Sequence, residues 1–172
     1  MTPDIPPVTE LMQPMDFNAD DLAANREGRL GNNQRQRLEA LQMRTLMIAS
    51  SGFMGIGIAA ATFFYFAQVN SSLVLQLMGI FVTIINALFV GMNGRQWMLL
   101  NADIRNADVE LISGTMERVV KADERMNNFL LRIDGNDFYV KKELFKLFRH
   151  EVPYRLYRTQ HAKILLAAEP TP

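Results

Sequence analysis

Two histidines, His150 and His161, are the side chains best suited to acid–base or metal chemistry in this 172-residue sequence. His150 precedes Glu151, but a zinc site needs three or four convergent ligands, and the sequence has no spacing that supplies them. Ser113 lacks the glycine-flanked turn of a hydrolase nucleophile, and no glycine-rich phosphate loop is present. The absence of cysteine excludes disulfides, thiolate metal ligands and cysteine nucleophiles. The sequence therefore predicts a non-enzymatic protein with no catalytic residue, no metal site and no cofactor.

A short stretch of tyrosines and arginines near the C-terminus is the remaining candidate for recognition. In a β-strand, where side chains alternate between faces, it would form a possible interaction edge made of Tyr154, Arg155, Tyr157 and Arg158. Lysine plus arginine equals aspartate plus glutamate, 18 against 18, so the overall charge does not favour nucleic acid as a partner. Half-buried strand residues with solvated arginines are the simpler interpretation of the same stretch.

Two uncharged apolar runs, 45–66 and 73–92, occupy the middle of the chain. Each has roughly 20 residues, which at about 1.5 Å of rise per residue matches a hydrocarbon core of about 30 Å. We expect both to be transmembrane helices, because the backbone must satisfy its own hydrogen bonds in lipid. The short connector 67–72 would form an external loop. Core helices of a soluble protein are the alternative, but such helices rarely stay uncharged for this length.

Arginines flank the two runs, whereas the connector between them carries no charge. By the positive-inside rule the connector faces out and both termini lie in the cytoplasm. The side chains expected at the membrane surface, where they would meet lipid headgroups, are Arg35, Arg37, Arg44, Arg95 and Trp97.

Small residues recur at every fourth position in both runs. Such a stripe lets two helix backbones approach closely in lipid, and an amide can add a hydrogen bond across the pair. The helix-packing residues predicted in this way are Ser51, Gly55, Ala59, Gly79, Thr83 and Ala87, together with Asn86.

The segment before the first run is predicted in two parts. Residues 1–17 contain four prolines and little periodicity, so we expect a disordered tail. Residues 18–44 are expected to form juxtamembrane helices on the cytoplasmic side. Asn18 can cap a short helix, and a second helix starts near Asn32 or Asn33 and continues into the first span.

The segment after the second run changes its pattern. Residues 93–107 are expected to be a helical extension or linker, and 108–169 a small β-rich cytoplasmic domain. Alternating residues predict three strands, a short helix and two more strands, at 109–122 (with a bulge at Gly114), 127–134, 137–140, 141–148, 152–159 and 162–169. The Gly135-Asn136 pair is expected to form the tight turn before the third strand. This β-β-β-α-β-β order predicts a membrane α+β protein whose small domain is a β-barrel-like or curved sheet.

The sequence NREGRLGNNQRQRL at 25–38 resembles a juxtamembrane pattern, N-R-x-G-x-L-x-x-x-Q-x-x-x-L, of uncharacterised bacterial two-span membrane proteins. The C-terminal run is similar to the small β-module of the same proteins through Phe138, Val140, Tyr154, Arg155, Tyr157, Ala168 and Glu169. The resemblance implies a two-span anchor with a β-module, and it implies no known activity.

The leading hypothesis is a membrane-anchored interaction or scaffold module that holds a β-domain at the cytoplasmic membrane face. Its partners would be membrane lipids and either a protein partner or further copies of the chain. Two alternatives stay open. The chain could be an accessory subunit of a transporter or membrane enzyme complex, or it could be a sensor of a lipid or small molecule, which would need a cavity in the β-module.

Overall fold

The computed structural model describes residues 7–122 and 127–171, and it divides the chain into two compact units. One unit combines the described parts of 1–37 and 105–172, and we call it the β-unit. The other unit, 38–104, consists of two long helices and is called the helical hairpin. The β-unit is therefore assembled from both ends of the chain, with the hairpin inserted between them in the sequence.

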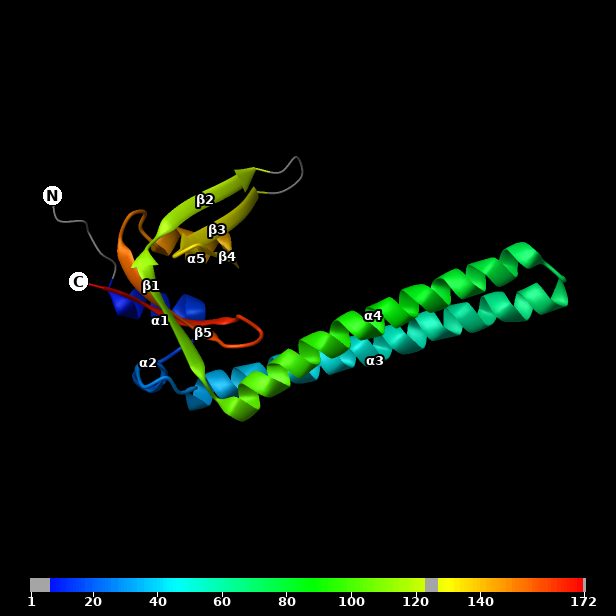
Figure 1. The fold of residues 1–172 in the computed structure, drawn as a ribbon, viewed down its shortest axis with the longest axis horizontal. Helices are drawn as coiled ribbons and strands as arrows, with labels where there is room; N and C mark the ends of the chain where they lie inside the picture. Colours follow the sequence, from blue (N-terminus) through cyan, green and yellow to red (C-terminus); the bar gives the residue numbers. More distant parts are fainter. Residues whose placement is uncertain (1–6, 123–126, 172) are drawn as a thin grey trace. The chain divides into compact units, whose positions relative to one another are not determined.

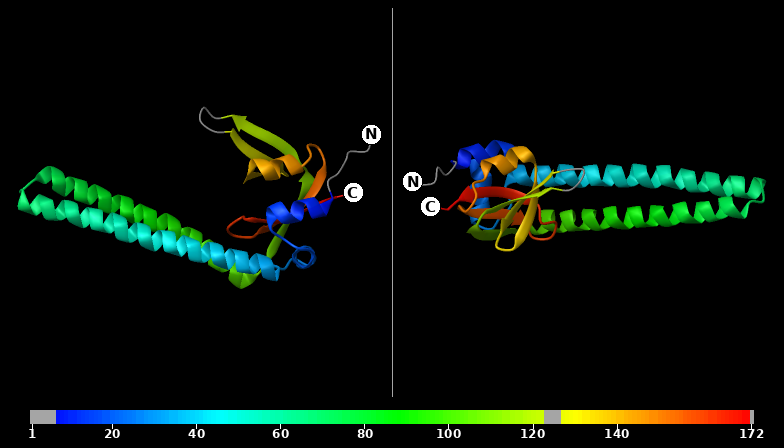
Figure 2. Two further views of the ribbon diagram at one scale, coloured as in Figure 1. Left: turned by 180° about the vertical axis from the view of Figure 1, so that it is seen from behind. Right: turned by 90° about the horizontal axis from the view of Figure 1, so that it is seen from above.

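The hairpin contains most of α3 (Asn32–Val69) and of α4 (Leu73–Asn106), which run side by side and antiparallel (Figures 1 and 2). Both helices are long and apolar enough to span a membrane. Only 6% of the most apolar stretch of α3 and 11% of that of α4 are buried inside the molecule. Helices in the core of a soluble protein would be mostly buried, so the apolar surface of this hairpin is left to be covered by something else.

The two helices do not pack through the predicted small-residue stripes. Ser51, Gly55 and Ala59 are exposed, and so are Thr83 and Ala87 on the other helix. The more buried positions instead follow steps of three and four residues, at Thr45, Ala49, Gly52, Ile56, Ala60, Phe63 and Ala67 of α3 and at Leu75, Gly79, Val82, Asn86, Phe89 and Asn93 of α4. An α-helix has 3.6 residues per turn, so residues spaced four apart throughout move gradually around the helix. Residues spaced alternately three and four apart stay on one face. The stripe prediction is wrong except at Gly79 and Asn86.

We call the more buried positions between α3 and α4 the helix seam. Aromatic rings, rather than small side chains, face the glycines of this seam. A Cβ added to Gly52 would overlap the ring of Phe89, and one added to Gly79 would lie 3.0 Å from the ring of Phe64. Asn86 is 8% exposed, and its Nδ2 donates a hydrogen bond to the backbone oxygen of Phe53 on the other helix at 3.3 Å. The predicted bond across the pair is present, with a backbone acceptor.

Two helices open the β-unit, α1 (Val8–Met15) and α2 (Ala19–Arg26). The prediction of a disordered tail is wrong for the described residues from 8 to 17. Leu11 is fully buried and Met15 is 5% exposed, and both belong to the core that the strands form. Their spacing of four residues places them on one face of α1, where burial of apolar surface stabilises a helix of modest intrinsic propensity.

The second helix starts as predicted. The Asn18 side chain accepts from the backbone N–H of Asp21 at 2.7 Å, and the Asp21 carboxylate accepts from the backbone N–H of Asn18 at 3.1 Å. This reciprocal pair satisfies two donors at the helix start. Gly28, with φ of +75°, ends the turn after α2. At Gly31 the chain passes so close to α2 that a Cβ would lie 2.7 Å from the Cα of Asp21.

The strands form two antiparallel three-stranded sheets, ordered β1-β5-β6 and β2-β3-β4. Their bounds are Val109–Thr115 (β1), Glu117–Ala122 (β2), Asn127–Ile133 (β3), Asn136–Val140 (β4), Pro153–Thr159 (β5) and Leu165–Pro170 (β6), and α5 is Lys142–Leu147. The single strand predicted over 109–122 is two strands, because the chain changes sheets at Met116. There Met116 donates to the oxygen of Val152 at 2.9 Å, and Glu151 donates to the oxygen of Met116 at 2.8 Å. Figure 1 shows β1 leading directly into β2.

The hairpin between β3 and β4 turns one residue earlier than predicted. Asp134 and Gly135 adopt φ of +47° and +72°, and Ile133 pairs with Asn136 across the turn. Two consecutive positive φ values are typical of the type I′ turn, which matches the twist of the strands it joins. Gly135 supplies one of these values without a steric cost.

Candidate functional site

A buried pair of side-chain amides joins α2 to the start of α3 within the β-unit. Asn25 donates to Oε1 of Gln34 at 2.8 Å, and Gln34 donates back to Oδ1 of Asn25 at 2.9 Å. Asn25 also donates to the Arg29 oxygen at 3.0 Å, and the second bond of Gln34 reaches the Leu166 oxygen at 3.4 Å. With Asn25 2% exposed and Gln34 fully buried, the pair satisfies groups that would otherwise be costly to bury.

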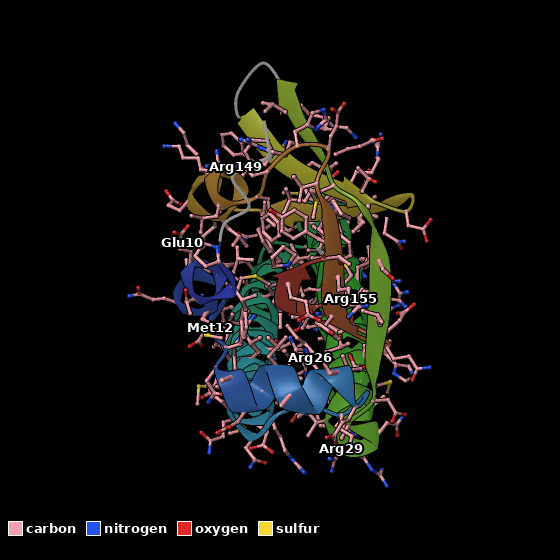
Figure 3. All side chains as sticks on the ribbon, turned by 90° about the vertical axis from the view of Figure 1, so that its left-hand side faces the viewer. Glu10, Met12, Arg26, Arg29, Arg149 and Arg155 are labelled. Atoms are coloured by element: carbon pink, nitrogen blue, oxygen red, sulfur yellow. The ribbon has the colours of Figure 1, made fainter. Side chains whose placement is uncertain are left out.

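A second polar group centres on the carboxylate of Glu169, a buried residue with 4% of its surface exposed. Arg26 contacts its Oε2 through Nη2 and, at 3.1 Å, through Nε. The Tyr157 hydroxyl donates to Oε1 at 2.7 Å, and Arg155 Nη1 lies 3.8 Å from the same oxygen. Figure 3 shows Arg26 on α2 and Arg155 on β5 on one face of the unit. We call Asn25, Arg26, Gln34, Tyr157 and Glu169 the polar cluster.

The cluster holds Glu169 charged and Tyr157 neutral. Burial raises the pKa of the Glu169 carboxyl, but the hydrogen bonds from Arg26 and Tyr157 outweigh it and leave the pKa below its ordinary value. Burial and the hydrogen bond to Glu169 raise the pKa of Tyr157 to about 12. Neither group is poised to exchange a proton near neutral pH, so the arrangement suits a structural fastening rather than acid–base chemistry.

The polar cluster brings together positions that are far apart in the sequence. Asn25, Arg26 and Gln34 belong to the juxtamembrane pattern, and Tyr157 and Glu169 belong to the C-terminal run. Glu169 pairs with Arg26, which lies 143 positions earlier in the chain. No residue near Glu169 in the sequence predicts this contact or the burial of its side chain. The direct link between the two sequence segments is therefore a finding of the structure.

An open groove of about 560 Å³ lies on the β-unit, formed by the end of α1, the start of α3, β4 and the approach to β6. Its apolar lining includes Met15, Phe138, Leu144, Ile164 and Leu165. The interior of the unit itself is filled by side chains such as Tyr154, Phe148 and Leu131, each fully buried. The pocket beside these buried side chains is thus an open groove along the side of the β-unit.

Five charged side chains also line the groove, Arg37, Lys141 and Lys163 against Asp16 and Asp137. Asp137 is paired with Arg132, whose Nε and Nη2 lie 2.7 Å and 3.2 Å from its two oxygens. Lys163 contacts Oε2 of Glu110 at 2.8 Å. Hydrogen bonds from Arg158 and Lys163 lower the pKa of Glu110 to about 2, so this carboxylate is charged throughout the physiological range. The lining carries one net positive charge.

Arg37 projects from α3 into this groove. Its Nη1 donates to the Met15 oxygen at 2.6 Å and its Nη2 to the Leu165 oxygen at 3.4 Å. These two carbonyls hold the guanidinium in place without neutralising it, and within 7–122 and 127–171 it forms no ion pair. Among the described residues, the groove therefore contains a positioned cation that has no ion-pair partner.

The rim of the groove includes the outer edge of β4. Because Ile133 and Asn136 close a two-residue turn, the backbone groups of Asn136, Phe138 and Val140 bond to β3. The N–H and C=O groups of Asp137 and Tyr139 must then point away from β3. Since β4 is the last strand of its sheet, these groups face the open side.

The predicted membrane-surface residues differ in their placement. Arg35, Arg44 and Arg95 are exposed, and Trp97 is 36% exposed. Arg37 is half-buried in the groove described above.

The predicted interaction edge is wrong for its tyrosines. Tyr154 is fully buried and Tyr157 is 2% exposed, because β5 is the central strand of its sheet and is covered on both faces. Arg158 is also enclosed, with its side chain 11% exposed and bonded to Glu110 at 2.9 Å and 3.1 Å. Only the Arg155 side chain, at 49% exposure, offers substantial surface.

The histidines do not form a metal centre in the described part of the chain. His150 accepts a hydrogen bond from the backbone of Arg118 at 3.1 Å, and its other nitrogen lies 3.7 Å from Glu151. No group of three or more His, Cys, Asp or Glu side chains close enough to hold a metal ion occurs among the described residues. No family model, no curated protein and no solved structure matches this chain.

Proposed function

We propose that this chain is a non-enzymatic, two-span membrane anchor that holds its β-unit at the cytoplasmic face of a membrane as an interaction or scaffold module. The proposal rests above all on one observation: the β-unit is built from both flanks of an apolar helical pair.

The exposed surface of the hairpin supports insertion into lipid. Large apolar side chains stand exposed around both helices, among them Met47, Phe53, Phe81, Leu88 and Met92. Soluble proteins rarely expose a continuous apolar surface of this extent, and the fully helical backbone meets the requirement that lipid imposes. The core of a bilayer is the environment that covers both helices along their length.

The construction of the β-unit supports an even number of crossings. Leu30 donates to the Ala107 oxygen at 2.9 Å, and Val109 donates to the Gly28 oxygen at 3.0 Å. Arg29 and Asp108 form an isolated antiparallel bridge between the same two segments. Segments that share backbone hydrogen bonds must lie on one side of a membrane, so the spans between them must cross it in pairs.

The flanking charges support the cytoplasm as that side. Arg35, Arg44 and Arg95 lie beside the apolar runs at the end nearer the β-unit, whereas the connector 67–72 has no charged residue. The excess of arginine marks the cytoplasmic side under the positive-inside rule.

Single cysteines test this topology without background, because the chain has none of its own. In intact cells a membrane-impermeant maleimide should label Ser71→Cys in the connector and should leave Tyr139→Cys unlabelled. Tyr139 is 68% exposed on the β-unit, so the same reagent should label Tyr139→Cys once the cells are opened. Labelling of both sites in intact cells, or recovery of the chain in water without detergent, would refute the proposal.

A further inference from the structure

We propose that the groove beside β4 binds the headgroup of an anionic phospholipid drawn from the membrane that holds the chain. This inference rests on the proposed function, because the membrane supplies the ligand. The membrane anchor by itself gives the groove no role, and lipid binding would supply one.

The charge of the groove matches a phosphodiester. After Asp137 is paired with Arg132 and Lys163 with Glu110, the groove retains Arg37 and Lys141 against Asp16. One phosphodiester carries one negative charge and several acceptor oxygens. Charge-assisted hydrogen bonds to a guanidinium and an ammonium are stronger than bonds between neutral groups.

The shape and lining of the groove match an amphiphile rather than a free ion. Its volume of about 560 Å³ lies within the usual range of small-ligand sites, far above what a bare phosphate fills. Leu144, Ile164 and Leu165 form an apolar wall beside the cations. A headgroup with its glycerol and the first methylenes of a chain would satisfy both parts of the lining.

Arg37 lies only a short distance along its helix from the proposed membrane span. Arg37 belongs to α3, the helix whose uncharged run starts at Thr45. At about 1.5 Å per residue this separation is roughly 12 Å along the helix, about twice the depth of one headgroup layer. Along α3, Arg37 is thus separated from the uncharged run by little more than about two helical turns.

An extended acidic peptide is the competing occupant, since β4 is an open edge. However, β4 directs the backbone of only two residues, Asp137 and Tyr139, to that side. Strand addition draws its affinity from a longer series of main-chain bonds. The balance of the lining favours a lipid.

The test uses the full chain in a non-ionic detergent, titrated with phosphatidylglycerol, with bound lipids counted by native mass spectrometry. We expect one tightly held phosphatidylglycerol. Lys141→Gln should weaken its binding about fivefold, the effect of one basic group near an anionic surface. Arg37→Gln should weaken it about tenfold or more, because a charge-assisted hydrogen bond is lost.

Matched controls separate the groove from general surface charge. Lys142 is the neighbour of Lys141 and does not line the groove, and Arg44 lies on the same helix as Arg37 but outside it. Lys142→Gln and Arg44→Gln should leave the tightest lipid in place. Lys141→Gln keeps the inference testable if Arg37→Gln fails to fold, because the Lys141 side chain is exposed.

Four outcomes would overturn the inference. These are equal retention by groove and control variants, equal binding of phosphatidylcholine, displacement of the lipid by millimolar inorganic phosphate, and displacement by a short glutamate-rich peptide. Failure of the proposed function is seen separately, in the cysteine labelling. The lipid measurement is made on protein whose two-span topology has already been verified.

Discussion

Replacing Arg26 should destabilise the β-unit more than replacing its partner Glu169. The two side chains form one ion pair, but the Glu169 side chain is 6% exposed and that of Arg26 is 56% exposed. Arg26→Met leaves a buried carboxylate with only the Tyr157 hydroxyl at 2.7 Å and Arg155 at 3.8 Å. Glu169→Gln leaves an arginine that water can solvate, and the new amide oxygen can still accept from Tyr157.

These differences set the size of the two effects. Removing one partner of a fully buried pair costs about 3–5 kcal/mol. Because Tyr157 and Arg155 still face Glu169, we expect about 2–3 kcal/mol for Arg26→Met. A hydrogen bond to a charged group contributes about 1.5–3 kcal/mol, and the exposure of Arg26 screens part of it. For Glu169→Gln we therefore expect about 1–2 kcal/mol.

Thiol labelling of a buried cysteine measures both values. Ala168 is fully buried in the core, and Ala168→Cys introduces the only thiol of the chain. When the open form closes again faster than the reagent labels it, the labelling rate follows the free energy of opening. Each decrease of about 1.4 kcal/mol in that free energy then speeds labelling tenfold. Arg26→Met should thus label about 30- to 150-fold faster and Glu169→Gln about 5- to 30-fold faster. A larger effect of Glu169→Gln, or additive effects in the double variant, would refute this account of the pair.

Three further changes test other contacts. Gly31→Ala should destabilise the β-unit by about 1–3 kcal/mol, because its Cβ would press on the backbone of α2; the same labelling assay measures this. The pKa of Tyr157 is about 12 in the folded chain and about 10 in the unfolded chain, so its neutral hydroxyl stabilises the fold by about 2–3 kcal/mol below pH 10. This stabilisation is lost as the pH rises from 10 to 12. Tyr157→Phe should therefore reduce the loss of unfolding free energy over that pH range, as measured by urea titrations. An unchanged alkaline profile would contradict that assignment. Gly52→Ile should lower the concentration of sodium dodecyl sulfate at which the two helices separate, because a Cβ at this position overlaps the Phe89 ring. Gly55→Ile should not, because a Cβ there has no neighbour within 4 Å. Equal shifts for the two variants would contradict the observed contact between the helices.

Features with local causes were predictable from the sequence. The long uncharged runs are helices, Asn18 caps α2, and α3 begins at Asn32. Each depends on residues within a few positions of one another, so composition and spacing carry the signal. The turn after β3 was misplaced by one residue, because Asp134-Gly135 and Gly135-Asn136 both suit positive φ.

Features that depend on distant contacts were not predictable. The prolines of the N-terminal segment concealed α1, whose Leu11 and Met15 become favourable only when the strands cover them. The sequence left open whether Tyr154 and Tyr157 form an exposed edge, because nothing local places β5 between β1 and β6. The helix seam was misjudged, because residue size alone does not show which face of α3 meets Phe89.

The shared construction of the β-unit also fixes an order of events during synthesis. The helices α1 and α2 leave the ribosome before the hairpin, whereas β6, whose Glu169 pairs with Arg26 of α2, leaves it afterwards. In the proposed two-span topology, both apolar helices must cross the membrane before these ends can meet. A chain that inserted only one of them would then hold the two ends on opposite sides of the membrane, and its core would stay open to proteases and chaperones. If the proposed topology holds, closure of the β-unit thus serves as a check that both helices were inserted.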